Sequence, residues 1–577
     1  MSKWSMEFRV ALLFFLFLWA YLIIRAFTVF YIHDEIVTKW CYVIRWNPLP
    51  NRGFIDANNH FLLSLIAGFF TRLFHSESMF VIRLGSLLAF PIYFWSIYRL
   101  KSFFQQKWNF YALFIGLTTA VFLIEFFALA RGYGLALAFL VFSLQQMMVF
   151  FHTHKKRALL GSLIGWFLAV FASLTLVPFA LVALFMLGVF VLKEKMYRWL
   201  LAILIALVPL YYFVLYLFEL KSLGKLYYGG KDGFFSSTVH SITRYFWSSE
   251  NSLLDAVLVI LSALILYSCA KGLIKTRSIF DPKVLFHLFF IIAIGNIFGQ
   301  HLLLGVNFPE DRTAIYLVVF FFGALLFSID ALTDKKGVGI VVASGSLLFF
   351  GANVNFTHSI SFSYEHLDPQ LVTLIPSSVK GTPPTTSGRL NMENEMTRTM
   401  NLPLRVYQEN DNPWDTLVDY MVFNPDRRPE LKNQYTILHR DNISGLALLK
   451  RKKSLSRTKV SRDKFQVVSE AEFQTLSSVP LQQPLLIRCS GTLSKLNDQT
   501  EIFIVISSED TLSKQSRTYE AVPIVINTKI GEGGSVTFDF SYALNRVKGA
   551  NRYNVYIWNL NRDVVEGQII LAVYTLD

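Results

Sequence analysis

"FRVALLFFLFLWAYLIIRAFTVFYIHDEIVTKW", residues 8–40, joins a long apolar run to an adjacent pair of acids. The apolar part is long enough for a helix to cross the roughly 30 Å hydrocarbon core of a membrane. Asp34 and Glu35 follow at the point where such a helix would return to water. The acids therefore either mark the water boundary or perform chemistry on something that the membrane delivers.

This apolar pattern recurs through the first part of the chain and then stops. Hydrophobic residues make up 53% of the 577 residues and the mean hydropathy is +0.43, which is unlike an ordinary soluble domain. After Asn355 the sequence is mixed and charged to its end. We predict an α-helical membrane half followed by a tail, with eleven spans near residues 9–30, 79–98, 109–128, 132–151, 159–175, 177–192, 199–218, 252–270, 284–303, 313–331 and 338–354.

Lysine and arginine are distributed so as to orient these spans. The basic segments "SKWSMEFR", "RLKSFFQQK", "HTHKKR", "KEKMYR", "KGLIKTR" and "DALTDKK" all fall on one face, which the positive-inside rule makes cytoplasmic. The first run is too long for a signal peptide and no small-residue cleavage site follows it, so we expect a retained span. The N-terminus is then cytoplasmic, and Asp34, Glu35 and the tail lie outside. Few sequons and sparse cysteine favour a bacterial inner membrane with a periplasmic tail.

The formal charge of +14 does not require a nucleic-acid partner, because much of it lies in the cytoplasmic loops. Another part lies in "KRKKSLSRTKVSRDK", residues 450–464, which we interpret as a solvated linker, with anionic headgroups as the alternative partner. The three cysteines indicate neither a disulfide framework nor a thiolate metal site. Asp34, Glu35, His33 and His60 lack the spacing of a metal motif, so we expect no metal and no other cofactor.

Two long external loops are predicted, at residues 31–78 and 219–250. In the first, Leu62, Leu65, Ile66, Phe69, Phe70 and Leu73 form an amphipathic stripe too short to span, so we expect a helix lying in the membrane interface. Asn58 and Asn59 are candidate caps for this helix. The second loop, with its Gly-rich turns, either covers a binding groove or is an exposed linker.

Four motifs in fixed order resemble the GT-C glycosyltransferases, most closely the protein O-mannosyltransferase and aminoarabinose–lipid A transferase branch. They are Asp34-Glu35 after the first span, "NNHFLLSL" (58–65) with "VIRLGSLL" (81–88), "EFFALARGYGLALAFL" (125–140) and "NFPEDRTAIYLVVFFFGALL" (307–326). The second motif keeps the family's histidine but loses two prolines, and Gly85 replaces a further proline. The resemblance covers about 350 residues, and these departures leave the sugar open.

The resemblance implies transfer of a sugar from a polyprenyl-phosphate donor to an extracytoplasmic acceptor. The leaving lipid phosphate is already stable as an anion, whereas the acceptor must lose a proton, which calls for a positioned carboxylate. The family pattern favours Asp34 as this general base and Glu35 as a supporting or acceptor-orienting group. The alternative is that both acids only solvate a helix end.

The resemblance also assigns donor phosphate binding to Arg312 and Arg131, because planar guanidinium groups bind phosphate oxygens bidentately. Snorkelling to the interface is the alternative for both, and Arg131 has a second one, an ion pair with Glu125. Further candidate substrate-binding residues are His60, Asn59, Tyr133, Tyr316 and Arg83. Each also has a structural alternative. These alternatives are polar surface for His60, a helix cap for Asn59, interfacial anchoring for the two tyrosines and helix anchoring for Arg83.

The tail divides into a mixed α/β region with the basic linker, residues 355–464, and a C-terminal region, residues 465–577. Seven β-type runs from "FQVVS" to "QIILAVYTLD" predict a β-sandwich. Tyr553, Tyr556 and Trp558 are either core residues or a carbohydrate platform, and a structural or acceptor-docking role is favoured.

We therefore predict a membrane glycosyltransferase whose partners are a polyprenyl-phosphate-linked sugar, an extracytoplasmic lipid, glycan or protein acceptor, and membrane lipids. A transporter or flippase of lipid-linked saccharide is an alternative, which would need ionisable residues near mid-membrane. A lipid-linked glycan ligase or polymerase is a second one. A membrane anchor for the sandwich is a third, and eleven spans are far more than it needs.

Overall fold

The computed structural model describes residues 5–50, 55–244, 252–333, 336–410, 415–468, 471–480, 483–497, 500–513, 515–524, 531 and 534–577. The chain separates into two compact units. The first comprises Met1–Phe30 and Val37–Ser361, and the second comprises Tyr31–Ile36 and Phe362–Asp577. The short acidic segment after the first helix is thus grouped with the tail.

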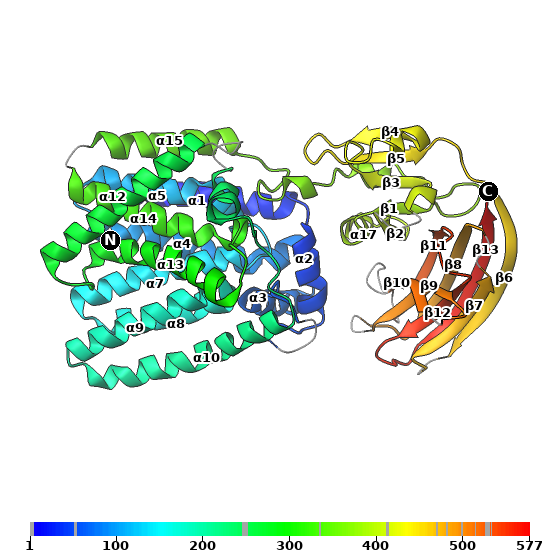
Figure 1. Cartoon of the computed structure of the whole chain (residues 1–577), viewed down its shortest axis with the longest axis horizontal. Helices are drawn as coiled ribbons and strands as arrows, with labels where there is room; N and C mark the ends of the chain where they lie inside the picture. The colour runs from blue at the N-terminus through cyan, green and yellow to red at the C-terminus, as the bar shows by residue number, and fades with distance from the viewer. Residues whose placement is uncertain are drawn as a thin grey trace. The chain divides into compact units, whose positions relative to one another are not determined.

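The first unit is a bundle of long helices that lie side by side (Figure 1). Its principal helices are α1 (Met6–Thr28), α3 (Phe61–Leu73), α4 (Met79–Arg99), α5 (Lys107–Thr119), α7 (Tyr133–Thr153), α8 (Lys156–Ala172), α9 (Val177–Lys193), α10 (Leu200–Ser222), α12 (Ser252–Thr276), α13 (Leu285–Leu304), α14 (Ile315–Leu332) and α15 (Gly337–Asn353). Short elements include η1 (Thr38–Ile44), α6 (Val121–Ile124), η3 (Glu125–Phe127), η4 (Leu174–Leu176), η6 (Phe234–Val239), α11 (His240–Thr243) and η8 (Asp311–Thr313).

Fewer helices than predicted meet the length and composition expected of a membrane span. In the described residues eight do so, and the pair Lys107–Thr119 and Val121–Phe127, bent by 54°, forms a ninth if it is one span. The expected span 109–128 is therefore broken at Ala120, whose backbone is extended. The expected spans 159–175 and 338–354 correspond to α8 and α15, which have 17 residues each. Within the described part of the chain, the nine spans and these two slightly shorter helices together lie at the eleven predicted positions.

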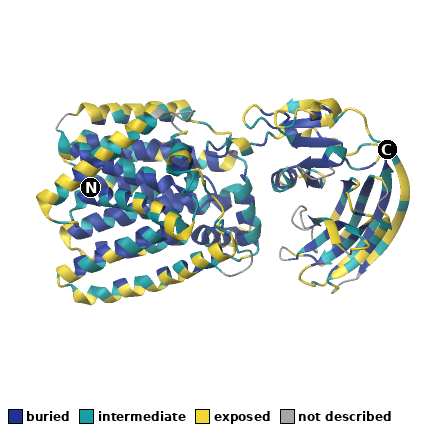
Figure 2. Cartoon of the chain, in the orientation of Figure 1, coloured by how far each residue is buried: buried dark blue, intermediate teal, exposed yellow. Residues whose placement is uncertain are grey.

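Burial varies across the bundle in the way that a membrane environment requires. In α7, 78% of the apolar window is buried inside the protein, whereas in α10 and α12 only 22% and 17% are. Figure 2 shows the buried residues in the middle of the bundle and the exposed ones along outer helices such as α15. Apolar side chains that remain exposed on these helices are expected to face lipid.

The predicted amphipathic helix is α3. It buries Phe61, Leu63 and Ala67 and leaves Phe69 and Leu73 more than half exposed, as an interfacial helix would. Neither asparagine is its N-cap, since that position belongs to His60, which makes no capping bond through its side chain. The capping prediction for Asn58 and Asn59 was therefore wrong.

The second unit contains a mixed five-stranded sheet of order β2-β1-β3-β5-β4. Strands β1 (Thr386–Gly388), β2 (Tyr407–Glu409) and β3 (Tyr420–Phe423) are parallel, and α17 (Leu390–Thr399) connects the first two. Strands β4 (Tyr435–Arg440) and β5 (Ala447–Arg451) form an antiparallel pair, as their short alternating runs predict. The start of the run "NPWDTLVDYMVF", up to residue 414, lies outside the described residues.

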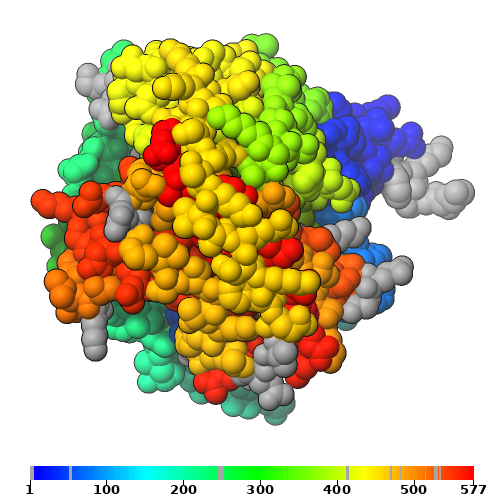
Figure 3. Space-filling model, turned by 90° about the vertical axis from the view of Figure 1, so that its right-hand side faces the viewer, coloured from blue at the N-terminus to red at the C-terminus, as the bar shows by residue number. Residues whose placement is uncertain are grey.

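The chain ends in a β-sandwich of two four-stranded sheets, β10-β9-β12-β7 and β11-β8-β13-β6 (Figure 1). The space-filling view in Figure 3 shows one outer face of this part of the chain, coloured from orange-yellow to red. Its strands are β6 (Arg457–Val468), β7 (Phe473–Pro480), β8 (Leu485–Ser494), β9 (Ile502–Asp510), β10 (Gln515–Pro523), β11 (Val536–Leu544), β12 (Arg552–Asn559) and β13 (Glu566–Leu576). Buried residues from both sheets, such as Ile487, Ile504 and Val555, form one core. The last part of the predicted strand "AVPIVIN", from residue 525, lies outside the described residues.

Two expectations about the tail were wrong. Residues 457–464 of the basic run belong to β6, which pairs with β13, so the run is not simply a linker and the sandwich begins before residue 465. Strand β7 was not predicted, because its alternating Ser and Thr residues resemble a loop. Tyr553 is fully buried in the sandwich, whereas Tyr556 and Trp558 are partly exposed and contact the ring of Phe473.

Candidate functional site

The first unit contains a cavity of about 200 Å³ at the end of the bundle where several helices begin. Asn59 and His60 precede α3, Tyr133 is the first residue of α7, and Thr175 precedes α9. Among the described residues, the lining consists of Ala57, Asn59, His60, Tyr133, Ser173, Leu174, Thr175, Pro178, Leu217, Lys225, Leu226, Tyr228, Asn296, Ile297, Gln300, Val306, Asn307, Pro309, Thr313 and Tyr316. The wall is therefore rich in neutral hydroxyl and amide groups.

The N-terminal ends of four helices, α3, α7, α9 and α14, contribute to this wall. The first N–H groups of a helix have no partner within the helix, and the helix dipole places about half a positive charge at that end. Helix N-termini consequently favour anions such as phosphate. The cavity is therefore electrostatically suited to an anionic group.

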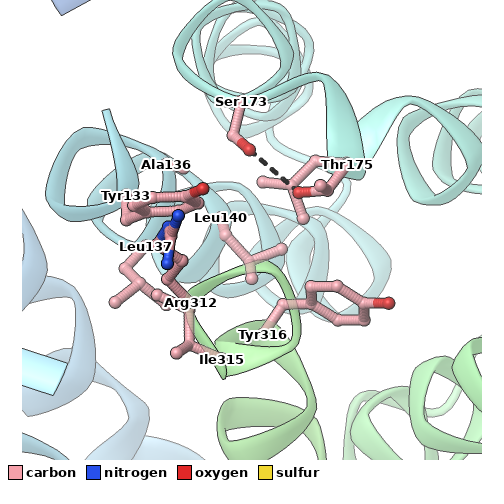
Figure 4. A pocket seen from close by; sticks show the side chains of 10 residues that line it. Tyr133, Ala136, Leu137, Leu140, Ser173, Thr175, Arg312, Ile315 and Tyr316 are labelled. Atoms are coloured by element: carbon pink, nitrogen blue, oxygen red, sulfur yellow. Dashed lines mark hydrogen bonds between the residues drawn. The ribbon is translucent and has the colours of Figure 1, made fainter. Parts of the chain in front are cut away.

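A smaller pocket of about 10 Å³ adjoins the cavity and shares Tyr133, Ser173, Thr175 and Tyr316 with it. Figure 4 shows Tyr133 from α7, Arg312 from η8 and Tyr316 from the start of α14 on this pocket. Ser173 and Thr175 are joined by a hydrogen bond of 2.9 Å between their hydroxyl groups. The structure thus brings together three of the predicted site residues, one arginine and two tyrosines.

Arg312 is held by the second long loop. Its Nη1 donates to the hydroxyl oxygen of Tyr228 at 2.8 Å, and its guanidinium lies 4.3 Å from the centre of the same ring. Asp311 forms an ion pair of 2.7 Å with Arg244. Burial raises the pKa of Asp311, and the charges of Arg244 and Arg312 oppose this rise.

The loop between α10 and α12 therefore packs against the segment before α14. Gly230 and Phe308 form a two-way backbone bridge, and the hydroxyl of Thr238 donates to the carbonyl of Pro309 at 2.7 Å. Lys225 and Tyr228 line the cavity. Residues 219–244 thus contribute to the cavity wall, and residues 245–250 of the loop lie outside the described residues. That the loop covers a binding groove stays a prediction.

His60 and Asn59 are both buried at the start of α3. His60 Nδ1 lies 2.9 Å from the carbonyl oxygen of Ala172, and its ring meets that of Tyr133 edge-on at 4.8 Å. Asn59 accepts a hydrogen bond from the Ser64 hydroxyl at 2.9 Å. Both residues line the cavity, so they are more than the polar surface that a local reading favoured.

Arg131 is buried directly before the N-terminus of α7. Its Nη2 donates to Asn58 Oδ1 at 2.5 Å, and the guanidinium lies 5.6 Å from the Tyr133 ring centre. The alternative ion pair with Glu125 is not formed. Glu125 instead pairs with Arg25 at 3.3 Å, and both side chains are fully buried.

Arg83 has a structural task in the first unit. Its Nη1 donates to the carbonyl oxygens of Ala26 at 3.1 Å and Val29 at 2.7 Å. Carbonyls at a helix end lack intrahelical donors, so this arginine caps the end of α1. It is absent from the lining of both pockets as described, and direct substrate contact by Arg83 stays a prediction.

The acidic pair lies on α2 (His33–Val37), and both residues fall in the second unit. Glu35 Oε2 accepts the backbone N–H of Ile32 at 3.2 Å. The backbone N–H of His33 donates to Glu365 Oε2 at 2.8 Å. Burial raises the pKa of Glu365, and the charge of Asp34 raises it further. The catalytic assignment of Asp34 and Glu35 stays a prediction.

Sequence reasoning missed Lys225, Tyr228, Thr175, Asn296 and Gln300. The two α13 residues carried a usable signal, because polar amides inside a membrane helix usually face a cavity or the bundle interior. The others lie in loops or at helix starts that contact the cavity only after folding. In the part of the chain that is described, no group of three or more His, Cys, Asp or Glu side chains is placed to hold a metal ion.

No family model and no curated protein matches the sequence. Among solved structures, ArnT from Cupriavidus metallidurans bound to undecaprenyl phosphate is similar over 77% of this chain and 97% of that chain, with 12% identity and a TM-score of 0.44. The arabinosyltransferase EmbB from Mycobacterium smegmatis is similar over 100% of this chain and 65% of its own, with 8% identity and a TM-score of 0.36.

The VP2 subviral particle of infectious bursal disease virus is similar over 23% of this chain and 35% of that one, with 11% identity and a TM-score of 0.16. The chain thus matches less than two thirds of the length of the viral and mycobacterial proteins. With every TM-score below 0.5, these similarities do not assign an activity, and the function has to be argued from the site.

Proposed function

We propose that this protein is a membrane glycosyltransferase that moves a sugar from a polyprenyl-phosphate donor to an acceptor outside the cytoplasm. The observation that carries the proposal is the cavity at the starts of α3, α7, α9 and α14, with Lys225 in its wall and Arg312 in the adjoining pocket. A lipid phosphate is an anion that the membrane itself delivers, and helix N-termini with a guanidinium group suit it.

In this proposal Arg312 binds the donor phosphate. Stacking on Tyr228 and the hydrogen bond from Nη1 hold the guanidinium in one orientation, which lowers the entropy lost on binding. Arg131, buried before α7, adds a second positive charge near Tyr133. Tyr133 and Tyr316 then present ring faces or hydroxyls to the sugar in the cavity.

The reaction needs a base more than it needs an acid. The bond from the anomeric carbon to the phosphate oxygen breaks, the electron pair leaves with the phosphate, and the acceptor oxygen forms the new bond while losing its proton. We propose that Asp34 accepts that proton as the general base and that Glu35 is the supporting carboxylate. Both assignments rest on the motif resemblance and on the place of the pair after α1.

The transporter alternative has less support. Among the described ionisable residues inside spans, His287 lies in the first turn of α13 and Asp330 near the end of α14, so neither is at mid-helix. His287 Nε2 contacts the Ser328 hydroxyl at 2.9 Å, and Asp330 accepts the backbone N–H groups of Gln105 and Gln106, both at 2.8 Å. Such local pairs are typical of structural residues rather than of an ion path.

Transfer from defined polyprenyl-phosphate sugars by the full chain in nanodiscs tests the proposal. We expect Asp34→Asn to abolish turnover while binding of undecaprenyl phosphate survives, and Arg312→Ala to weaken that binding. Asp426→Asn and Arg9→Ala change exposed residues that are not among the described residues lining the cavity, and they serve as controls. Normal turnover of Asp34→Asn would remove Asp34 as the base, and absence of any transfer by the wild type would overturn the proposed function.

A further inference from the structure

Helix α13 carries two amide side chains on the face that lines the cavity. Asn296 and Gln300 are one helical turn apart in an otherwise apolar segment, and Gln300 Nε2 donates to Asn296 Oδ1 at 3.2 Å. Burying an amide in an apolar environment without partners costs a few kcal/mol, so such residues in membrane helices normally have a partner or a function. The pair is therefore a candidate binding element.

The amides retain hydrogen-bonding capacity beyond the bond they share. An amide offers two donors and two acceptor lone pairs. The shared bond uses one Gln300 donor and one Asn296 acceptor, which leaves the Asn296 NH₂ group and the Gln300 carbonyl oxygen for a ligand in the cavity. Across the lining, Thr175, Tyr316 and Thr313 add hydroxyl groups. A ligand with several hydroxyl groups of its own matches this wall better than an apolar one.

The cavity is large enough for such a ligand. About one water molecule fits per 10–15 Å³ of this volume, so 200 Å³ corresponds to roughly 15 water molecules. A sugar joined to a phosphate can therefore enter it.

From these observations we infer that Asn296 and Gln300 form the subsite that recognises the hydroxyl groups of the donor sugar. This inference rests on the proposed function and deepens it, because it names the residues that select the sugar.

The test compares donor binding and transfer for the wild type, Asn296→Leu and Gln300→Leu. Gln146→Leu is a matched control, because Gln146 also sits in a membrane helix, α7, and donates to the neighbouring amide of Gln145 at 2.8 Å, yet lines neither pocket. Leucine is similar in size to both amides and removes only their hydrogen bonding. Full-length protein in nanodiscs is used throughout.

We expect each α13 variant to raise the KM for the sugar-bearing donor about tenfold, the usual effect of losing one or two ligand hydrogen bonds. Binding of undecaprenyl phosphate without a sugar stays unchanged. Among monodeoxy analogues of the accepted donor, at least one is discriminated against by the wild type, and Gln300→Leu or Asn296→Leu loses that discrimination. Gln146→Leu behaves as the wild type.

Two results overturn the inference while leaving the proposed function intact. One is that both α13 variants discriminate between donor analogues as the wild type does, and the other is that both keep the wild-type KM for the sugar-bearing donor. If the wild type transfers no sugar at all, the proposed function fails instead. Direct binding then still decides the subsite, since both leucine variants must bind the sugar-bearing lipid more weakly than the wild type while binding undecaprenyl phosphate equally.

Discussion

The backbone N–H of His33 donates a hydrogen bond of 2.8 Å to the Glu365 carboxylate, a residue 332 positions further along the chain. His33 is the first residue of α2, and an acceptor there satisfies one of the N–H groups that the helix itself leaves unpaired. The same helix carries Asp34 and Glu35. A residue of the tail thus fixes the start of the short helix on which the proposed base lies.

Replacing Glu365 separates its hydrogen bond from its charge. Glu365→Ala removes the acceptor, and we expect transfer to fall by about an order of magnitude. Glu365→Gln keeps an acceptor but removes a negative charge that interacts with the charge of Asp34. A neighbouring negative charge raises the pKa of a carboxyl group, so its loss lowers the pKa of the base and moves the acidic limb of the pH–rate profile to lower pH. An unchanged profile in Glu365→Gln would show that the two carboxylates do not interact.

Glu393 makes the tail sensitive to alkaline pH. Burial in α17 raises the pKa of Glu393 to about 8, with backbone groups and the charge of Arg389 opposing the rise. Because the folded pKa exceeds the unfolded value near 4.5, the stabilisation is fully present below pH 4.5. It is lost as pH rises towards 8, on the order of 5 kcal/mol in all.

Glu393→Gln removes the titrating group and keeps its shape. We expect hydrogen exchange in residues 390–399 to be slower in this variant than in the wild type at pH 8, and the difference to shrink at pH 5. Equal protection of the two proteins at pH 8 would contradict the assignment.

The buried ion pair of Arg25 and Glu125 holds the segment that follows α15. Glu125 also accepts the backbone N–H groups of Ile360 at 2.9 Å and Ser361 at 3.0 Å. Breaking a buried pair leaves an uncompensated charge and costs about 3–5 kcal/mol, whereas exposed pairs contribute about 1 kcal/mol or less. We expect Glu125→Gln to lower the unfolding temperature markedly and to speed proteolysis near residues 355–361. Glu7→Gln, which breaks the exposed pair with Lys101, is the control and changes little.

Gly132 permits the close approach of three segments at the cavity. A Cβ at this position would lie 2.3 Å from the carbonyl oxygen of Ala172 and 2.5 Å from His60 Nδ1. We therefore expect Gly132→Ala to displace His60 and to reduce donor binding at least tenfold. In α9, a Cβ at Gly188 would meet nothing within 4 Å, so Gly188→Ala should bind donor normally. Comparable binding by both variants would show that the contact at Gly132 is easily relieved.

Tyr228 orients the Arg312 side chain through two contacts, a hydrogen bond to its hydroxyl and a cation–π contact with its ring. Tyr228→Phe removes the hydroxyl that accepts from Nη1 and keeps the ring, whereas Tyr228→Ala removes both. We expect the donor KM to rise about fivefold in the first variant and by a further factor of about three in the second. If Arg312 contacts the phosphate, isothermal titration calorimetry with undecaprenyl phosphate should give affinities that fall in the same order: wild type, Tyr228→Phe, Tyr228→Ala. Unaltered binding in both variants would place the phosphate elsewhere.

Local patterns in the sequence predicted several elements because each depends on neighbouring residues alone. The length and hydropathy of residues 8–30 predicted α1, and the spacing of Leu62, Ile66 and Phe69 predicted α3. Alternation predicted the β4–β5 pair and most strands of the sandwich. The break at Ala120 was not predictable in this way, because no proline or glycine occurs there to mark it.

The candidate site was predicted less completely for a physical reason. The motif resemblance identified Tyr133, Tyr316, His60 and Arg312 as candidates, and each of them lies beside a helix start. It did not identify any residue of α13. Asn296 and Gln300 join them only because α13 packs beside the starts of α9 and α14. Their amide groups were visible in the sequence, but which side of the helix faces a cavity depends on its neighbours.

By itself, then, the sequence determined which segments enter a membrane and which form strands, since transfer of apolar groups from water and backbone pairing act over a few residues. Only the tertiary structure decided that Glu125 pairs with Arg25 rather than Arg131, and that Glu365 holds the start of α2. Arg25 is 100 residues from Glu125, and His33 is 332 residues from Glu365. Only the packing of the folded chain brings residues so far apart in the sequence within hydrogen-bonding distance.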